Sequence, residues 1–345
     1  MTNVLKKIIL VFLFASSIIF FYTYVWDYNI SPHNNIHYIE ISKKDTSEAS
    51  LLNVFKKTFN AVPDFVLGFH VKYLLKFRSK KIVPGRYNIQ GYSRLRHVFQ
   101  HIFSGNQELI RLYINSQIQH PENFNSYVSK KTNCRYSYKK PKFYDAKTHY
   151  FFNGIDSANI FFRLMPGTYT LSWASDCQEI DLLIDNLYAD FWNQSRCSKA
   201  RDMGFTPHEI TVIASIVQCE SKIASEQRKI AGVYINRLRS NMPLQADPTL
   251  VFANRLSGVK RLNDRDKKIK SNYNTYIYMG LPPGPIVLTG SLAIESVLNA
   301  ENHSFLFFCA KPERNGYSNF SSTYNEHLKH AKNYQTALNK QKIFR

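Results

Sequence analysis

The chain has 345 residues, of which 44% are hydrophobic, so it can bury a full core and is expected to form two or three folded units. This composition excludes a disordered chain. Its 45 Lys and Arg outweigh 25 Asp and Glu and give a net charge of +20, which suggests nucleic acid, an anionic membrane surface or a polyanionic polymer as partner. The basic residues are spread along the chain, and no nucleic-acid recognition motif accompanies them.

The amino-terminal segment predicts a membrane anchor. Lys6 and Lys7 precede an uncharged apolar run over residues 8–26, which is long enough to span a bilayer and ends in aromatic residues typical of its interface. A cleaved signal peptide is the alternative, but it has a shorter apolar core and a small-residue cleavage site. Because the lysines precede the span, we expect residues 1–27 to form a cytoplasmic tip and a single transmembrane helix. The rest of the chain then lies outside the cytoplasm, which argues against nucleic acid.

Two patterned regions follow the span. Residues 28–118 mix strand-like and helix-like patterns such as IHYIEIS, SLLNVFKKTF and SRLRHVFQHIFSG, which predict a small α+β module. Residues 119–158 are polar, basic and rich in tyrosine, and we interpret them as a connecting region. Residues 159–345 are better patterned, and EIDLLIDNLYADFWNQ predicts an amphipathic helix. The expected fold class is therefore α+β.

The cysteines form no CxxC pair and show no framework spacing. An odd number of cysteines outside the cytoplasm leaves at least one unpaired, or all of them reduced. No histidine stands at ligand spacing from them, so no metal site is expected. The five residues are Cys134, Cys177, Cys197, Cys219 and Cys309.

The stretch TPHEITVIASIVQCE predicts a helix that carries an acid on its apolar face. Thr206 and Glu209 form a Thr-x-x-Glu capping box around Pro207, so the start of the helix is well specified. At about 100° per residue, Glu220 falls on the same arc as the apolar side chains. The arc comprises Ile210, Ile213, Ile216 and Val217.

An acid in this position has two interpretations. Burying a carboxylate costs several kcal/mol unless it is paired, metal-bound or protonated, and desolvation raises its pKa. A carboxyl group that keeps its proton near neutral pH is what a general acid requires. The alternative is a buried ion pair of Glu220 with Arg228 or Arg237 on the next predicted helix, near SEQRKIAGVYINRLRS, whose apolar positions predict ordinary core packing.

Three compact strings of polar and turn-forming residues follow the helices: MPLQADPT at 242–249, YNTYIYMGLPPGPI at 273–286 and STYNEH at 322–327. Pro and Gly restrict loop backbones, so these loops can present polar side chains in rigid positions. Each string alone predicts only a turn. The candidates for presentation are Gln245, Asp247, Asn274 and Thr275.

In order, ASIVQCES, IAGVYINRL, MPLQADPT, YNTY, GLPPGPI, GSLAIESVL and YNEH resemble the MltG (YceG-like) family, the membrane-anchored endolytic murein transglycosylases. The resemblance covers roughly residues 160–337. Upstream, IVPGRYNIQGYSRLRHVFQHIFSGNQ is similar to the LysM-like module of that family, and LMPGTYTLSW to the joining segment. The resemblance therefore implies a LysM-like module at 28–118 and a YceG-like catalytic domain at 159–345, and the basic connecting region at 119–158 between them has no counterpart in it.

The resemblance also implies roles for single residues. Glu220 falls on the catalytic glutamate of the family, and no cofactor or metal is implied. Many members have another acid two residues earlier, where this chain has Gln218; because Gln218 lies off the apolar arc, we expect this difference not to affect the chemistry. Substrate-binding roles are implied for Gln245, Asp247, Asn274 and Thr275.

The implied reaction cleaves the MurNAc–GlcNAc bond of nascent peptidoglycan strands and leaves 1,6-anhydro-MurNAc ends. Glu220 acts first as acid and then as base, and one carboxylate suffices because the 6-hydroxyl of the same sugar attacks. The alternatives are a hydrolytic muramidase, with Asp247 or Glu226 as second carboxylate, and a non-catalytic wall-binding scaffold. The expected partners are glycan strands, the cytoplasmic (inner) membrane and peptidoglycan synthases, with the catalytic domain on the extracytoplasmic side.

Overall fold

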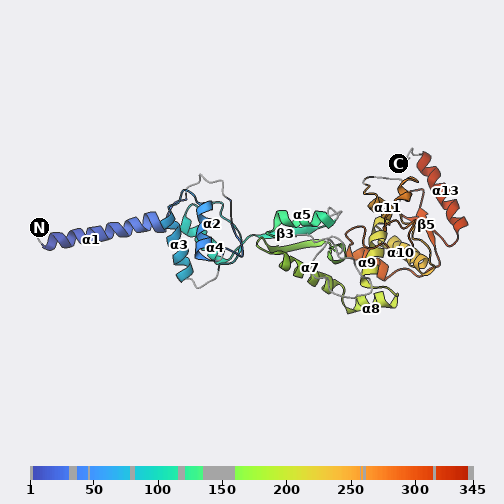
Figure 1. Ribbon diagram of the computed structural model, residues 1–345, viewed down its shortest axis with the longest axis horizontal. Helices are drawn as coiled ribbons and strands as arrows, with labels where there is room; N and C mark the ends of the chain where they lie inside the picture. The colour runs from blue at the N-terminus through green and yellow to red at the C-terminus, as the bar shows by residue number, and fades with distance from the viewer. Residues whose placement is uncertain are drawn as a thin grey trace. The chain divides into compact units, whose positions relative to one another are not determined.

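The computed structural model describes residues 3–30, 37–45, 47–77, 82–115, 121–134, 160–256, 258, 262–313 and 316–340. Within these residues the chain is a mixed α+β protein with one apolar amino-terminal helix, which confirms the expected fold class (Figure 1). It divides into two compact units. The amino-terminal unit comprises Met1–Leu112, Val128–Arg135 and Tyr169–Cys177, and the carboxy-terminal unit comprises Tyr113–Tyr127, Tyr136–Thr168 and Gln178–Arg345.

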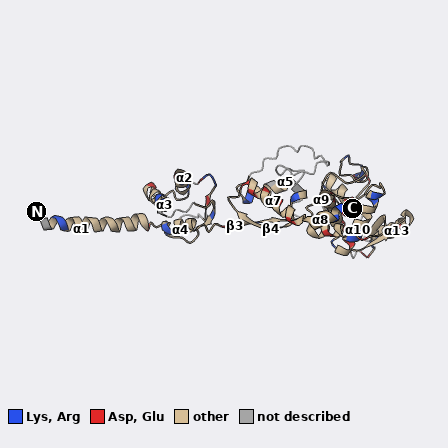
Figure 2. Ribbon diagram, turned by 90° about the horizontal axis from the view of Figure 1, so that it is seen from below, with Lys and Arg blue, Asp and Glu red and all other residues tan. Residues whose placement is uncertain are grey.

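The chain begins with helix α1 (Asn3–Phe20), which continues through a short π-helical segment, η1 (Phe21–Trp26). Together they form an apolar helix over Leu5–Trp26 with a mean hydropathy of 2.3. Only 6% of this helix is buried by the rest of the protein. Figure 2 shows charged residues near the amino-terminal end of α1 and none along the rest of it. By length and composition this helix is compatible with a single-pass membrane anchor.

A small core forms in the amino-terminal unit between one β-ribbon and three helices. Strands β1 (Tyr38–Ile41) and β2 (Gly85–Asn88) pair antiparallel, and alternate residues of β1 point inward. Phe55 and Phe99 meet in this core with ring centroids 4.5 Å apart. The helices are α2 (Glu48–Thr58), α3 (Asp64–Phe77) and α4 (Leu95–Ser104).

A second two-stranded sheet joins β3 (Leu109–Ile114) to β4 (Gly167–Ser172). The expected connecting region at 119–158 is partly helical, because α5 (Pro121–Lys131) lies within it. Residues 119, 120 and 135–158 of that region lie outside the described residues. A short helix, α6 (Ile160–Arg163), precedes β4.

One cysteine pair is formed. A disulfide joins Cys134 to Cys177, 43 residues further along the chain, with a Cα–Cα distance of 4.9 Å. The other three cysteines are free, in agreement with an odd number that leaves at least one unpaired. Disulfides persist in oxidising compartments outside the cytoplasm, so the bond agrees with the predicted topology.

The carboxy-terminal unit is built on three mutually packed helices, α9, α10 and α12. The predicted capping box is confirmed: Glu209 N donates to Thr206 Oγ1 (3.2 Å), and Thr206 N donates to Glu209 Oε2 (2.8 Å). The apolar arc of α9 is fully buried. The elements of this unit are α7 (Cys177–Phe191), α8 (Gln194–Asp202), α9 (Pro207–Glu220), α10 (Ala224–Arg239), α11 (Asp247–Ala253), η2 (Asp266–Lys268), α12 (Ser291–Leu298), β5 (Phe307–Ala310), β6 (Ser318–Ser321) and α13 (Tyr324–Lys340).

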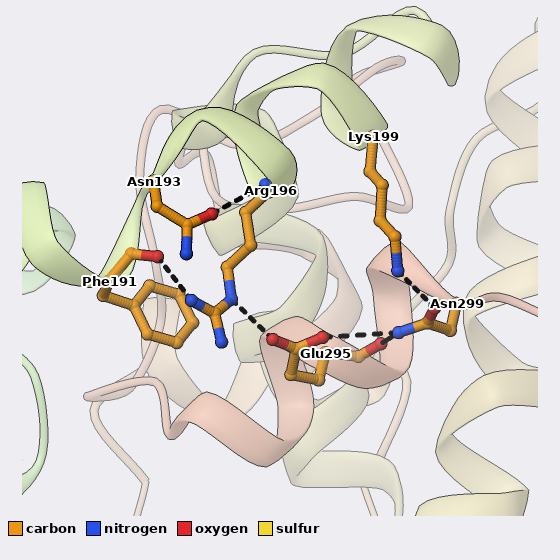
Figure 3. A network of polar contacts seen from close by, with 6 residues as sticks. All are labelled: Phe191, Asn193, Arg196, Lys199, Glu295 and Asn299. Carbon is orange, nitrogen blue, oxygen red and sulfur yellow. Dashed lines mark hydrogen bonds and ion pairs between the residues drawn. The ribbon is translucent and has the colours of Figure 1, made fainter.

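Polar contacts hold α8 against α12 (Figure 3). Arg196 Nε donates to Glu295 Oε1 at 2.5 Å, and its guanidinium lies 4.3 Å from the centre of the Phe191 ring. Lys199 Nζ donates to Asn299 Oδ1 at 2.9 Å. Because Arg196 and Glu295 are both partly shielded from water, their ion pair is screened less than a fully exposed one.

Candidate active site

Glu220 is the last residue of α9, and Ser221 after it has extended backbone dihedrals. The acid therefore closes the apolar arc rather than interrupting it, and it remains partly accessible where residues 210–217 are buried. The carbonyl end of a helix carries partial negative charge, which disfavours an ionised carboxylate there. The position itself thus favours the protonated form of Glu220.

The carboxylate of Glu220 meets one phenol. Tyr234 Oη, from α10, donates to Glu220 Oε1 at 2.8 Å, and Tyr234 is only 2% exposed. Burial raises the pKa of Glu220 from 4.5 to about 7; the hydrogen bond from Tyr234 lowers it, and the negative charge of Asp247 raises it. Burial, together with the neighbouring Glu220, keeps the pKa of Tyr234 well above its ordinary value, so the phenol retains its proton. At neutral pH the Glu220 carboxyl group is able both to give and to accept a proton.

The alternative of a structural ion pair does not match this geometry. Among the described residues, Glu220 takes part in no ion pair. Arg228 is exposed, and Arg237 instead donates to the backbone carbonyls of Leu306 (2.7 Å) and Leu244 (2.8 Å). Arg237 thus ties α10 to two later segments of the chain, and Tyr234 remains the observed partner of the acid.

A second carboxylate–phenol pair lies in the same electrostatic neighbourhood. Tyr276 Oη donates to Asp247 Oδ1 at 2.6 Å, and Asp247 begins α11 at an exposed position. Glu220 and Asp247 both raise the pKa of Tyr276, although burial is the larger cause. We call Glu220, Tyr234, Asp247 and Tyr276 the carboxylate–tyrosine cluster.

Gln245 lies two residues before Asp247 and is exposed. Its backbone has φ 50°, in the left-handed region, and its N–H donates to the carbonyl of Thr275 at 3.0 Å. Its side-chain oxygen accepts a weaker bond from Arg237, at 3.4 Å. The left-handed backbone of Gln245 is therefore held by a hydrogen bond while its side chain is exposed.

Asn274 and Thr275 point into the protein instead. Asn274 is fully buried: its Nδ2 donates to the carbonyls of Lys267 (2.9 Å) and Ile269 (2.8 Å), and its Oδ1 accepts from Tyr276 N (3.0 Å). Thr275 Oγ1 accepts from Ala246 N at 3.0 Å and bonds to the hydroxyl of Thr249 at 2.9 Å. Their side chains hold the 242–249 and 273–286 loops together and set the backbone of Tyr276.

Glu226 and Gln218 also bond to the chain itself. Glu226 is buried, and its Oε2 accepts from Ser318 N at 2.8 Å. Gln218 Nε2 donates to the carbonyl of Leu288 at 2.9 Å, and its Oε1 accepts from Gly290 N at 2.7 Å, which ties α9 to the start of α12. The side chain two positions before Glu220 therefore has to donate to one backbone group and accept from another. A carboxylate in its place could accept from Gly290 N but has no N–H to donate to the carbonyl of Leu288.

Sequence reasoning missed Tyr234, which it assigned to ordinary core packing, and Tyr276. A signal for Tyr234 was present, because a phenol at a buried helix position needs a partner for its hydroxyl where Phe would not. Within the part of the chain that the structure describes, no group of three or more His, Cys, Asp or Glu is suited to hold a metal ion.

Comparisons with known proteins place this site in context. The endolytic murein transglycosylase of Bacillus subtilis (strain 168) is 31% identical over 202 residues, which are 58% of this chain and 55% of that protein. The endolytic murein transglycosylase of Streptococcus pneumoniae serotype 2 (strain D39) is 33% identical over 153 residues, which are 43% of this chain and 27% of that protein. The chain thus spans about half or less of the length of these relatives.

A solved structure and a family model complete the comparisons. The crystal structure of a putative YceG-like protein from Listeria monocytogenes shares 20% identity and a TM-score of 0.49, covering 85% of this chain and 97% of that one. The model of the YceG-like family matches residues 44–333. Because that match takes in well over half of its residues, the chain belongs to the YceG-like family.

Proposed function

We propose that this protein is an endolytic lytic transglycosylase that cleaves the MurNAc–GlcNAc bond of nascent peptidoglycan strands and leaves 1,6-anhydro-MurNAc ends. The observation that carries the proposal is the partly buried carboxyl group of Glu220. Burial raises the pKa of this group to about 7. Two relatives in the same family are named endolytic murein transglycosylase, which supports the same reaction class.

In the proposed reaction Glu220 serves twice. Its protonated carboxyl gives the proton to the glycosidic oxygen as the bond from that oxygen to C1 of MurNAc breaks. The carboxylate then removes the proton of the 6-hydroxyl of the same sugar while that oxygen bonds to C1, so the acid is regenerated and no water is consumed. A pKa near the working pH suits both steps, because each needs a different protonation state of the same group.

The neighbouring groups support this chemistry. Positive charge that develops at C1 is stabilised by the acetamido group of the substrate and by the exposed carboxylate of Asp247, which Tyr276 orients. Gln245 is exposed on the adjoining loop and is proposed to bind the sugar directly. Asn274 and Thr275 are proposed to act on the substrate through the loop that they hold together rather than by contact.

A hydrolytic muramidase is the second candidate, because Asp247 is a carboxylate that influences Glu220 electrostatically. Glu226 is less suited to that role, since it is buried and bonded to the backbone of Ser318. The products separate the two enzymes: water would give reducing ends, heavier than anhydro ends by one water.

We also propose that residues 28–118 form a LysM-like glycan-binding module and that residues 159–345 form the catalytic domain, joined by the basic region at 119–158. The helix over Leu5–Trp26 would hold both on the extracytoplasmic side of the cytoplasmic membrane, where peptidoglycan synthases also act. Lys6 and Lys7 before the helix, and the disulfide after it, support this orientation.

The test uses the full chain in detergent with purified peptidoglycan and mass analysis of the glycan ends. We expect anhydro ends from the unaltered protein and none from Glu220→Gln, which keeps the shape but has no proton to transfer. Glu226→Gln is the matched control, because its amide oxygen still accepts from Ser318 N and cleavage should persist. Undiminished cleavage by a folded Glu220→Gln protein would remove Glu220 from the mechanism, and a wall-binding scaffold would show no cleavage at all.

A further inference from the structure

The end of the apolar helix packs against α3 of the amino-terminal unit. His70 of α3 is buried, and its Nε2 lies 2.8 Å from the carbonyl oxygen of Val25 in a hydrogen bond. Ring contacts add to this bond, so the exit of the apolar helix is fixed on α3. The ring pairs, with their centroid distances, are Phe21–Phe69 (4.9 Å), Trp26–Tyr73 (4.9 Å) and Trp26–His70 (5.9 Å).

These contacts show which side of α3 is turned toward α1. Trp26, at the end of the apolar helix, touches His70, Tyr73 and Phe69, and Phe21, about one π-helical turn closer to its apolar centre, also touches Phe69. Phe69 thus lies on the side of α3 that is turned toward the end of the apolar helix. In Figure 1, α3 lies beside the end of the apolar helix.

Phe69 belongs to a stripe that faces away from the core. Phe65, Phe69, Lys72 and Lys76 are spaced by four, three and four residues, so they share one face of α3. Phe65 is a large apolar residue, yet it is 62% exposed. The opposite face is the buried one, formed by Val66, Leu67, His70 and Val71.

The composition of this stripe fits a lipid surface. Two phenylalanines insert at the boundary between headgroups and acyl chains, and lysines bind lipid phosphates, as in helices that lie in the membrane interface. The Lys72 side chain is 72% exposed, and its contact with Glu48, at 3.8 Å, joins two exposed groups and is weak. Aromatic residues at the end of a membrane span favour the same depth, which is where Trp26 holds α3.

We infer that α3 lies on the outer surface of the bilayer that holds α1, with Phe65 and Phe69 inserted and Lys72 and Lys76 beside lipid phosphates. The inference rests on the proposed membrane anchor and is independent of the chemistry of Glu220. It gives the amino-terminal unit a second attachment to the membrane, beside the apolar helix that is fixed on α3.

The test places a nitroxide spin label on the full chain in liposomes of phosphatidylcholine with phosphatidylglycerol. The free cysteines are first replaced by serine, and the disulfide is kept by labelling without reductant. Labels are then introduced by Phe65→Cys, by Leu109→Cys as a matched control at a 56% exposed apolar position of the same unit, and by Phe14→Cys within the apolar helix, which is 68% exposed. The replaced cysteines are Cys197, Cys219 and Cys309.

The measurement is the ratio of label accessibility to oxygen, which concentrates in lipid, and to a water-soluble nickel complex. We expect this ratio at position 65 to exceed that at position 109 severalfold and to approach that at position 14. A lipid value at 14 with an aqueous value at 65 overturns the inference and leaves the anchor intact. An aqueous value at 14 overturns the anchor and this inference together, while the product analysis for Glu220 stands apart from both.

Discussion

Tyr234→Phe tests how this protein sets the proton affinity of its acid. The substitution removes only the hydroxyl that donates to Glu220 Oε1 at 2.8 Å. The ring keeps its place in the core, where it meets Phe308 edge-on with centroids 5.8 Å apart. The variant should therefore fold, and its effect should appear in the ionisation of Glu220.

The size of the effect follows from the strength of the bond. A hydrogen bond to a charged group contributes about 1.5–3 kcal/mol, and one pKa unit corresponds to about 1.4 kcal/mol. Because the bond from Tyr234 lowers the pKa of Glu220, its loss should raise that pKa from about 7 by about one unit or more. Glu220 must be protonated to begin the reaction, so activity falls as pH rises through its pKa, and that fall should move to higher pH in the variant.

The assay is the pH dependence of kcat/KM for release of anhydro-ended fragments, which reports the ionisation of the free enzyme. Tyr273→Phe is the matched control, because burial alone raises the pKa of that phenol and Glu220 has no part in it. Its profile should coincide with that of the unaltered protein. An unshifted profile for a folded Tyr234→Phe protein, or a shift to lower pH, would refute the reasoning.

Four further substitutions probe stability. The pKa of Glu220 is raised from 4.5 to about 7 in the folded protein, so the stability that its protonated form contributes is present below pH 4.5 and is lost as pH rises through about 7. Glu220→Gln should therefore gain stability relative to the unaltered protein across that window, by at most about 3 kcal/mol in denaturant titrations, and a constant difference would contradict the raised pKa. Gln218→Leu should destabilise the carboxy-terminal unit by about 1–3 kcal/mol, because it leaves one partly buried donor and one acceptor without their partner. In thermal unfolding, Gln218→Glu should restore only part of this stability. Cys134→Ser opens a disulfide loop of sequence separation 43 and should lower the free energy of unfolding by about 4 kcal/mol without reductant. With dithiothreitol, the variant and the unaltered protein should have almost the same stability. If the two proteins were equally stable without reductant as well, the bond would not form.

Local patterns in the sequence determined the parts of this protein that depend on neighbours within a few residues. The capping box of Thr206 and Glu209 and the spacing of the apolar residues specify the start and the buried face of α9, because capping and helical periodicity act over one or two turns. The same periodicity placed Glu220 on the buried side. The apolar run after Lys7 specified the amino-terminal helix, since length and hydropathy are properties of a single segment.

Contacts between segments were decided only by the tertiary structure. The phenol that bonds Glu220 comes from another helix, and nothing in the sequence pattern shows which buried side chain its hydroxyl reaches. Asn274 lies in the same loop as Tyr276, but its side chain turns inward. There it donates to backbone carbonyl groups, which need hydrogen-bond partners when they are buried. The disulfide of Cys134 likewise joins segments whose distance in space is set by packing rather than by spacing. Hydrogen bonds and disulfides act over a few ångströms in space, and only the folded chain determines which distant residues come that close.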